Sequence, residues 1–579
     1  MTELLTQNMA PIMFGALVIF LLLGYPVAFA LAANGIFFGL VGVELGLLHP
    51  SLFQALPQRI WAIMSNDTLL AVPFFTFMGL ILERSGMAED LLDTIGQLFG
   101  PLRGGLAFAV IFVGALLAAT TGVVAASVIS MGLISLPIML RYGYDRRFAT
   151  GAIAASGTLA QIIPPSLVLI VMADQLGKSV GDMYAGAFLP GLVLTGLYAL
   201  YAVGVTLLKP SWAPALPLEA RVFREPNGGS GIASLLVLVI VAVGVSVAYA
   251  EYRYGAPDAP LDEMLVVATA VGVGVAFFAA VVNRVLKLGL LSRIAERVTF
   301  VLIPPLALIF LVLGTIFLGV ATPTEGGAMG ATGALVMALT RRRLSLPLLR
   351  QAMDTTAKLT SFVLFILVGA RVFSLTFYGV DGHIWVEHLL TGLPGGQLGF
   401  LIAVNVLVFV LAFFLDFFEL AFIIIPLLGP VADKLGIDLI WFGILLSINM
   451  QTSFMHPPFG YALFYLRSVA PAKDYVDKVT GKPIARITSG QIYWGAVPFV
   501  LLQVIMVALV IAFPNLVGGG IAKKEAINID RIDISIPEAT LPGGADAQES
   551  LEEALSKALG GGASEKTPAP AAPPAGTGK

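Results

Sequence analysis

The chain alternates between long apolar runs and short polar connections. Runs such as 10–31, 232–250 and 494–513 are each long enough to cross a bilayer. The pattern predicts crossing helices near 10–31, 35–49, 68–83, 184–208, 230–250, 264–283, 298–320, 325–341, 355–378 and 491–514. Two further regions, 105–176 and 398–470, are apolar but are interrupted by clusters of Gly, Pro, Ser and Thr. The pattern therefore predicts an all-α polytopic membrane protein that lies within a lipid bilayer.

The composition excludes several classes of protein. Of the 579 residues, 58% are hydrophobic and 12% are charged, whereas a soluble domain carries about 25% charged residues. A soluble enzyme is therefore excluded, and the net charge of −3 offers no basic surface for nucleic acid. With no cysteine, four histidines and no His-Glu-x-x-His motif, we predict no transition metal site. The segment LGKS at 176–179 lacks the upstream glycine of a phosphate-binding loop, so we do not expect ATP to be used.

The distribution of charge predicts how the chain crosses the membrane. Loops rich in Lys and Arg are expected on the cytoplasmic side, and they are 141–147, 209–224, 284–297, 341–350 and 467–486. The acidic loops at 251–263 and around Asp381 are expected outside. All of these loops fall on their expected sides if both termini are periplasmic and each interrupted region contains one re-entrant hairpin.

The two interrupted regions are related to each other. The segment 136–145 aligns with 429–438, and Pro164-Pro165 aligns with Pro457-Pro458, all at an offset of 293 residues without a gap. The first segment ends in a basic loop and its counterpart in an acidic one, so they are expected on opposite sides of the membrane. This predicts two inverted repeats with re-entrant hairpins and discontinuous helices, an architecture found in secondary transporters. Two related halves can exchange inward and outward conformations, and if they form an elevator, 105–176 and 398–470 should move together.

The same pattern predicts a division into eight parts. They are first-repeat scaffold helices (1–104), a first hairpin and broken helix (105–176), a scaffold helix and cytoplasmic loop (177–228), an additional helical pair (229–297), second-repeat scaffold helices (298–397), a second hairpin and broken helix (398–470), a loop and last helix (471–516), and a largely disordered Pro-rich tail (517–579).

Polar residues precede both proline pairs, and we interpret them as unwound helix midpoints. Unwound backbone is tolerated in a membrane only inside protein or beside a watery cavity. Carbonyls freed by proline, together with hydroxyls, are hard oxygen ligands suited to Na⁺. The candidate sodium ligands are Ser156, Gly157, Thr158, Asn449, Gln451, Thr452 and Ser453. The alternative is a proline kink whose carbonyls are bonded by neighbouring Ser and Thr. The hairpin turns are predicted near 120–122 and 416–419, opposite the breaks.

Ionisable residues inside spans are functional candidates by default. Glu325 either contributes to function or caps the helix that begins at this point. Arg371 either attracts a carboxylate of the substrate or forms an ion pair with an acid such as Glu325. Asp416 and Glu419 lie at the second hairpin turn, where they coordinate an ion or are solvated outside. His456 directly precedes the second proline pair, and it has a substrate or gating role or is a satisfied buried histidine.

Several motifs resemble the large membrane subunit (DctM type) of a TRAP (tripartite ATP-independent periplasmic) transporter. The resemblance covers residues 10–515 and rests on LGYPVAFAL at 23–31, VPFFTFMGLILERSG at 72–86, TGVVAAS at 121–127, GTLAQIIPPSLVLIV at 157–171, ATPTEGGAMG at 321–330 and NMQTSFMHPPFGYALFYLRSVAP at 449–471. The enlarged segment at 209–297 and the Pro-rich tail depart from the family pattern.

This resemblance implies a Na⁺-coupled, elevator-type importer of an organic acid in the bacterial inner membrane. Such a subunit works with a small four-helix membrane subunit and a periplasmic substrate-binding protein. The family places Na⁺ where each hairpin turn meets a break, which adds Thr120, Thr121, Gly122 and Asp416 to the sodium candidates. The substrate-binding candidates are Ser127, Pro165, Ser166, Arg371, Glu419 and His456.

Two alternatives remain open at this point. One is a stand-alone Na⁺–carboxylate symporter or an ion antiporter of similar architecture. The other, from a different class, is a non-transporting assembly or receptor subunit in the membrane. Dependence of uptake on an added binding protein distinguishes the first alternative from the tripartite importer.

Overall fold

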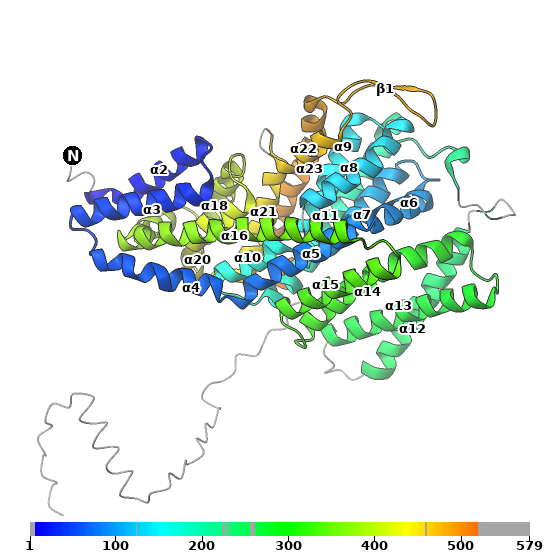
Figure 1. Cartoon of the computed structure of the whole chain (residues 1–579), viewed down its shortest axis with the longest axis horizontal. Helices are drawn as coiled ribbons and strands as arrows, with labels where there is room; N and C mark the ends of the chain where they lie inside the picture. The colour runs from blue at the N-terminus through cyan, green and yellow to red at the C-terminus, as the bar shows by residue number, and fades with distance from the viewer. Residues whose placement is uncertain are drawn as a thin grey trace, which may run out of the picture. The chain divides into compact units, whose positions relative to one another are not determined.

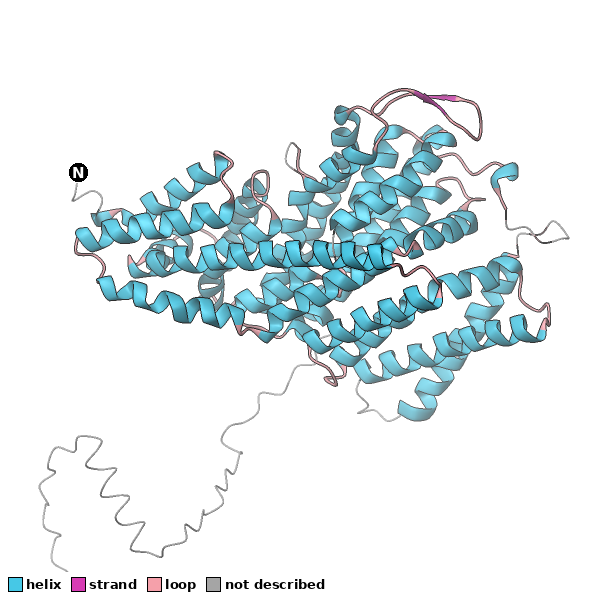
Figure 2. Ribbon diagram, viewed as in Figure 1, coloured by secondary structure: helices cyan, strands magenta, loops and turns pink. Residues whose placement is uncertain are grey.

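The computed structural model describes residues 6–518 except 123, 223–224, 226–228, 230, 255–260 and 458–459. The described part is helical apart from one short antiparallel pair, β1 (Tyr475–Val476) and β2 (Pro483–Ile484), as Figure 2 shows. Within it, 8 helices are long and apolar enough to cross a membrane, or up to 10 if two bent helix pairs each count as one span. The tail predicted at 517–579 lies outside the described residues from 519 onward.

The helices of the two repeats follow the same order along the chain. The first repeat contains α2 (Met9–Leu22), α3 (Val27–Glu44), α4 (Leu56–Met64), α5 (Ala71–Arg84), α6 (Met87–Phe99), α7 (Gly105–Thr121), α8 (Val124–Arg141), α9 (Arg146–Thr158), α10 (Leu167–Leu176) and α11 (Val180–Leu208). The second contains α14 (Arg293–Phe317), α15 (Pro323–Thr340), α16 (Leu346–Gly379), α17 (Gly382–Thr391), α18 (Gly396–Leu411), α19 (Phe417–Ile423), α20 (Ile425–Lys434), α21 (Leu439–Met450), α22 (Tyr461–Val469) and α23 (Ser489–Ala512).

The offset of 293 residues holds between these helices. The return arm of the first hairpin, α8, runs from Val124 to Arg141, and that of the second, α19 with α20, runs from Phe417 to Lys434. The next helices, α9 and α21, each begin directly after a capping aspartate. Asp145 and Asp438 accept backbone N–H groups there and satisfy donors that the first helical turn leaves free. The repeat predicted from the sequence is therefore confirmed at the level of helix bounds.

Equivalent helices of the two repeats make equivalent contacts with the other repeat. The second half of the first broken helix, α10, packs against α19, α20 and α21, while its counterpart α22 packs against α8 and α9. In the same way α3 packs against α16, and its counterpart α15 packs against α5. Such reciprocal packing is what a two-fold relation between the repeats produces. In Figure 1, α2 and α20 lie toward the left, and β1 lies at the upper right.

The predicted boundary between the first two helices was wrong. We expected crossing helices near 10–31 and 35–49, but the chain forms α2 and α3, with a break at 23–26. Gly24 adopts a positive φ of 77°, and Pro26 directly precedes α3. Both residues end helices for local steric reasons, and the apolar pattern did not reveal this because it continues unbroken across them.

The additional helical pair forms as predicted. It consists of α12 (Ile232–Tyr254) and α13 (Leu261–Leu286), which pack against each other and against α14. Large apolar side chains of α12 remain exposed, for example Ile240 at 68% and Val237 at 60%. Exposure of this kind along a 23-residue helix fits a surface in contact with lipid.

Candidate functional site

The first hairpin turn lies directly against the first break. Gly122 ends α7 in a left-handed conformation with φ of +59°, and a side chain added there would lie 3.3 Å from the carbonyl oxygen of Pro165. Glycine is the residue that adopts this φ without strain. The turn predicted at 120–122 is confirmed in position. The side chains of Thr120 and Thr121 lie outside the described part, so their candidate role stays a prediction.

The first break begins later than predicted. Ser156, Gly157 and Thr158 are still helical, and the chain leaves the helix only after the short 3-10 helix Leu159–Gln161. Ser166 then caps α10, since its hydroxyl donates to Gln161 O (2.5 Å) and accepts from Val168 N (3.2 Å). The bond between Pro164 and Pro165 is cis. The unwound segment is therefore 162–166, and Ser166 and Pro165 lie in it.

The second break follows the same course. Asn449 is helical, and Gln451, Thr452 and Ser453 form a 3-10 helix (Gln451–Phe454) where we predicted unwound backbone. The chain is irregular from Met455 until α22 begins at Tyr461, with 458–459 outside the described residues. The predictions located both breaks, but a few residues too early. A turn of 3-10 helix extends each helix because its hydrogen bonds need one residue less than those of an α-helix.

Most candidate hydroxyls donate to their own helix. Ser156 Oγ donates to Ala152 O (2.6 Å), Thr158 Oγ1 to Ala155 O (2.8 Å), and Thr452 Oγ1 to Asn449 O (2.7 Å). This is the behaviour expected of hydroxyls that saturate helix carbonyls in a kinked helix. Each hydroxyl oxygen nevertheless keeps lone pairs that can accept a further bond.

A hydrogen bond joins the two breaks. Gln451 Nε2 donates to Thr158 Oγ1 over 3.1 Å, and both side chains are fully buried. The two residues are 293 positions apart, so each occupies the position equivalent to the other in the repeat. Equivalent residues can touch only near the symmetry axis, and the breaks therefore meet on it.

Several buried polar atoms around the breaks lack a partner in the described part of the chain. They are Gln161 Oε1, Gln451 Oε1, Ser453 Oγ and both ring nitrogens of His456. Each of these side chains is at most 6% exposed. A buried polar atom without a hydrogen bond costs about 1–3 kcal/mol, so such atoms cluster where a ligand, ion or water completes them.

The second hairpin turn carries two acids that cap a helix. Asp416 Oδ1 accepts from Glu419 N (2.9 Å), and Glu419 Oε2 accepts from Asp416 N (2.9 Å). Glu419 is only 8% exposed, so simple solvation outside the membrane does not describe it. The reciprocal bonds begin α19 and fix the turn beside the second break, which α19 contacts.

His456 stacks on the second hairpin. Its ring lies 4.0 Å from the ring of Phe413 at an interplanar angle of 16° and 4.5 Å from Phe409 at 78°, and the backbone of Ala412 lies beside it. The structure thus places His456 between the end of α18 and the second break, at 2% exposure. Neither ring nitrogen meets the geometry of a hydrogen bond within the described residues, and the role of His456 in substrate binding or gating stays a prediction.

The remaining candidates lie elsewhere or are structural. Glu325 caps α15 through reciprocal bonds with Thr322, which confirms its capping role. The suggested pair between Arg371 and Glu325 is therefore wrong, because Glu325 bonds within its own turn. Arg371 lies within α16, on the same helix as Tyr378, whose hydroxyl donates to Pro426 O of the second hairpin (3.1 Å). Ser127 is buried in α8 at 1% exposure.

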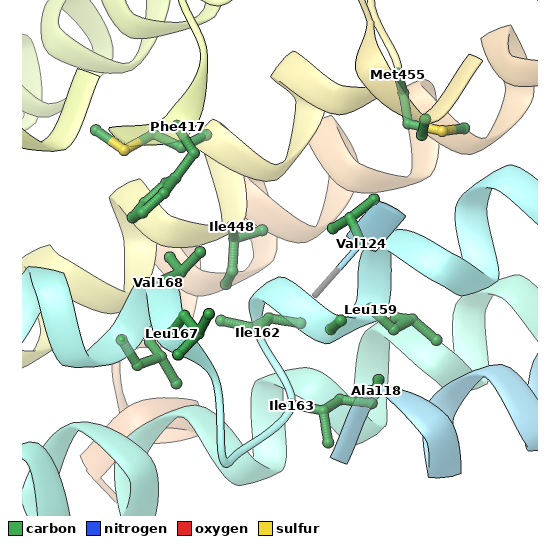
Figure 3. Packing of buried hydrophobic residues seen from close by; sticks show 14 of the residues in the cluster. Ala118, Val124, Leu159, Ile162, Ile163, Leu167, Val168, Phe417, Ile448 and Met455 are labelled. Atoms are coloured by element: carbon green, nitrogen blue, oxygen red, sulfur yellow. The ribbon is translucent and has the colours of Figure 1, made fainter. Parts of the chain in front are cut away.

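An apolar core surrounds the polar groups. In Figure 3, Ala118 and Val124 of the first hairpin lie near Leu159 and Ile163, while Phe417, Ile448 and Met455 come from the second repeat. All of these side chains are at most 7% exposed. The hairpins and broken helices are thus held together by packing.

Sequence reasoning missed two residues that belong to this region. Asn449 Nδ2 donates to both the carbonyl and the side-chain oxygen of Asn405, at 2.8 and 2.9 Å. Gln161 supplies one of the unpartnered oxygens. Asn405 and Gln161 are single amides within apolar runs, at 398–411 and 159–170, and that isolation was the available signal.

Known proteins are similar to this chain over most of its length. The family model of the tripartite ATP-independent periplasmic transporter, DctM component, matches residues 14–516. The chain belongs to this family of TRAP transporter large permeases. It is 28% identical to the C4-dicarboxylate TRAP transporter large permease protein DctM of Pseudomonas aeruginosa, over 82% of this chain and 92% of that one. It is 26% identical to the DctM protein of Rhodobacter capsulatus, over 88% and 99%.

Two further similarities are more distant. The isethionate TRAP transporter permease protein DctMQ of Oleidesulfovibrio alaskensis is 25% identical over 81% of this chain and 62% of its own length. The solved structure of the Alcanivorax borkumensis YdaH transporter covers 81% of this chain and 91% of its own, with 16% identity and a TM-score of 0.46. As a TRAP large permease, the chain is a multi-pass transport protein.

Proposed function

We propose that this permease imports an organic acid across the inner membrane by coupling its movement to Na⁺. In this proposal the acid arrives on a periplasmic substrate-binding protein, and a separate small four-helix membrane subunit completes the transporter. Both termini of the permease face the periplasm. The related C4-dicarboxylate permeases and the family match support the class of substrate and the partners.

The observation that carries the Na⁺ proposal is the group of unpartnered oxygens at the breaks. Gln161 Oε1, Gln451 Oε1 and Ser453 Oγ are buried, uncharged oxygen atoms, which are the ligand type that hard cations prefer. Gly122 and the Pro165 carbonyl bring the first hairpin turn within reach of the same break. Na⁺ would be a co-substrate here, held by these oxygens and by lone pairs of the neighbouring hydroxyls.

Substrate recognition is proposed beside the two breaks. His456, Ser166 and the turn that carries Glu419 lie next to irregular backbone, where N–H and C=O groups can contact a carboxylate. Arg371, on the adjoining α16, supplies positive charge toward the second hairpin. The hairpins and broken helices would carry substrate and Na⁺ together as one body, which is an elevator movement.

The experiment is uptake into proteoliposomes that hold the permease and its small subunit, with the binding protein outside. An imposed Na⁺ gradient should drive accumulation of the organic acid, and ATP should have no effect. Uptake of equal rate with K⁺ in place of Na⁺, at fixed pH and membrane potential, would contradict the coupling. Uptake without the binding protein would instead indicate a stand-alone symporter, and no uptake under any condition would favour a non-transporting subunit.

A further inference from the structure

A chain of polar side chains leads from the breaks to the last helix of each repeat. Gln451 Nε2 donates to Thr158 Oγ1 (3.1 Å), and the Thr158 side chain also forms a hydrogen bond with the Tyr198 hydroxyl of α11. Gln503 Nε2 of α23 donates to the same hydroxyl (3.0 Å). All four side chains are fully buried, so these bonds are made away from both lipid and solvent.

The packing of α23 on α9 brings Gln503 to the first break. The two helices lie side by side, and a side chain added at Gly495 of α23 would lie 2.9 Å from Thr150 Oγ1 of α9. Glycine at 495 therefore permits this close approach. The same number of residues further along each helix lie Gln503 in α23 and Thr158 in α9, so the two side chains meet at one level.

The rules for donors and acceptors give this chain a direction. A tyrosine hydroxyl has one hydrogen to donate, and the oxygen of Tyr198 already accepts from Gln503. Tyr198 therefore donates to Thr158 Oγ1, the other side chain that bonds it in the described part of the protein. Thr158 in turn donates to Ala155 O (2.8 Å) and accepts from Gln451. Thr158 is thus bonded on all sides, and the oxygen without a partner at this end of the chain is Gln451 Oε1.

The polar chain is not repeated on the other side of the symmetry axis. Counted from the proline inside each helix, Tyr198 of α11 corresponds to Met506 of α23, and Gln503 corresponds to Thr195. Methionine has no hydroxyl, and the hydroxyl of Thr195 donates to its own helix. The described helices therefore hold this chain on one side of the axis only, the side of the first break.

We propose that Tyr198 and Gln503 are positioning residues for the coupling ion. Through Thr158 they hold the Gln451 amide in one orientation, with Nε2 bonded and Oε1 directed at Na⁺. This proposal rests on the proposed Na⁺ coupling. A glutamine that is already held loses less side-chain freedom when it binds an ion than a free one does, so the ion binds more tightly. The helices α11 and α23 thus contribute to ion affinity without supplying a ligand.

Tyr198→Phe tests the positioning role directly. The change removes the hydroxyl and keeps the ring that packs on Phe499 at 5.2 Å. In proteoliposomes with the small subunit and the binding protein, the Na⁺ concentration for half-maximal uptake should rise about three- to tenfold, the effect expected from one hydrogen bond. At saturating Na⁺, the concentration of organic acid for half-maximal uptake should stay within about twofold of the parent value, because the hydroxyl acts on an ion ligand.

Tyr201→Phe is the matched control. Tyr201 lies on the same helix and packs on the same Phe499 ring at 5.1 Å, but its other ring contact is Phe148, near the start of α9 and away from the break (6.1 Å). Its Na⁺ titration should match that of the parent. Similar titrations for the two tyrosine variants would overturn the positioning role. A rise in the half-saturating organic acid concentration that equals the rise for Na⁺ would also overturn it, because a general structural effect produces that pattern.

Gln503→Met tests the far end of the chain. Methionine keeps a similar volume but cannot donate to Tyr198. The Na⁺ concentration for half-maximal uptake should rise again, but less than for Tyr198→Phe, because the tyrosine still reaches Thr158. A parent-like titration would exclude Gln503 from the proposed pair. The melting temperature of each variant in detergent shows that it is folded.

A double-mutant cycle tests whether Tyr198 acts through Gln451. Added to Gln451→Leu, Tyr198→Phe should change the Na⁺ dependence by less than about twofold, because the ligand that it positions is already gone. Added to Thr452→Ala it should have its full effect, since Thr452 donates to Asn449 O and lies outside this chain. Full effects in both backgrounds would show that Tyr198 does not act through Gln451.

These results separate the positioning role from the proposed function. Uptake by the parent protein that does not depend on Na⁺ would remove the proposed Na⁺ coupling itself. Uptake that depends on Na⁺ in the parent, with an unchanged titration in Tyr198→Phe, would keep the coupling and remove only the positioning role.

Discussion

At the scale of single residues, the breaks combine saturated and unsaturated polar groups. The hydroxyls of Ser156, Thr158 and Thr452 donate hydrogen bonds to carbonyls of their own helices, and these bonds offset the cost of burying the hydroxyls. Gln451 and Ser453 keep an oxygen without a partner among the described residues. The first group holds the kinked helices together, and the second group can bind a ligand without breaking an existing bond.

Gln451→Leu tests the second group. The change removes the bond to Thr158 and one unpartnered oxygen while keeping a similar volume. We expect the Na⁺ concentration for half-maximal uptake to rise about tenfold, since losing one hydrogen-bonding group near a cation costs about 1–2 kcal/mol. Asn34→Leu is the matched control, because Asn34 is another buried amide and its Nδ2 donates to Met13 O (3.2 Å) between α3 and α2. Equal effects of the two variants on Na⁺ dependence would contradict a site at Gln451.

Thr158→Ala and Thr452→Ala test whether each break contributes its own ion site. Each variant removes a hydroxyl oxygen, so each should raise the Na⁺ concentration for half-maximal uptake while leaving membrane insertion unchanged. Thr195→Ala provides the comparison, since Thr195 makes the same kind of bond to its own helix, at Gly191 O (2.8 Å), within α11. Na⁺ titrations of uptake would show the difference. If all three variants behave alike, the hydroxyls serve only to solvate the kinks.

At the scale of helices, the repeat made much of the fold predictable. The offset of 293 residues could be read from the sequence because it joins residues with the same structural role. Asp145 and Asp438 cap equivalent helices, and Pro137 and Pro430 lie within equivalent hairpin arms. Partners between distant segments were not predictable in this way. The bond between Gln451 and Thr158 depends on the symmetry axis passing through the breaks, and no local pattern encodes the position of an axis.

The same limit applies to the edges of elements. The 3-10 helices before each break, and the stop at 23–26, depend on local backbone geometry that apolar periodicity does not report. The capping role of Glu325 was predictable because Thr322 and Glu325 have the spacing of a capping box. The predicted ion pair between Arg371 and Glu325 was wrong for the same reason, since the Glu325 carboxylate is already bonded within the capping box.

Gly35→Val tests the packing of α3 on α16. A side chain at Gly35 would lie 2.8 Å from Val372 O and 2.9 Å from the backbone of Phe373, so the helices would have to separate. We expect a loss of about 1–3 kcal/mol in stability, seen as a lower melting temperature in detergent. Gly15→Val in the adjacent α2 has open space around it and should melt like the parent protein. An unchanged melting temperature for Gly35→Val would show that α3 does not approach α16 this closely.

At the scale of the whole molecule, the contacts divide into two kinds. Between the hairpins and broken helices they are extensive and apolar, as the core around Leu159, Phe417 and Ile448 illustrates (Figure 3). Between this group and the flanking helices they differ from place to place: α9 packs closely on α23, whereas α10 meets the loop before α5 through a bond from Asn66 Nδ2 to Asp174 Oδ1 at 2.6 Å. If the hairpins and broken helices move as one body, α23 should move with α9, and the contacts that break should be the remaining outer ones.

The elevator predicts opposite outcomes for two cysteine pairs. Asn66→Cys with Asp174→Cys joins the loop before α5 to α10, and linking them should abolish uptake, because the body can no longer leave its present position. Gly132→Cys with Val469→Cys joins α8 to α22 inside the proposed body, where a side chain at Gly132 would lie 2.7 Å from Val469 Cγ2. That link should leave uptake close to the parent level, since no relative motion is required there. Both pairs are measured before and after reduction, so each protein is its own control for folding. If the 66–174 link leaves uptake unchanged, or if the 132–469 link blocks it, the two repeats do not move as one body and a local gate must open the pathway instead.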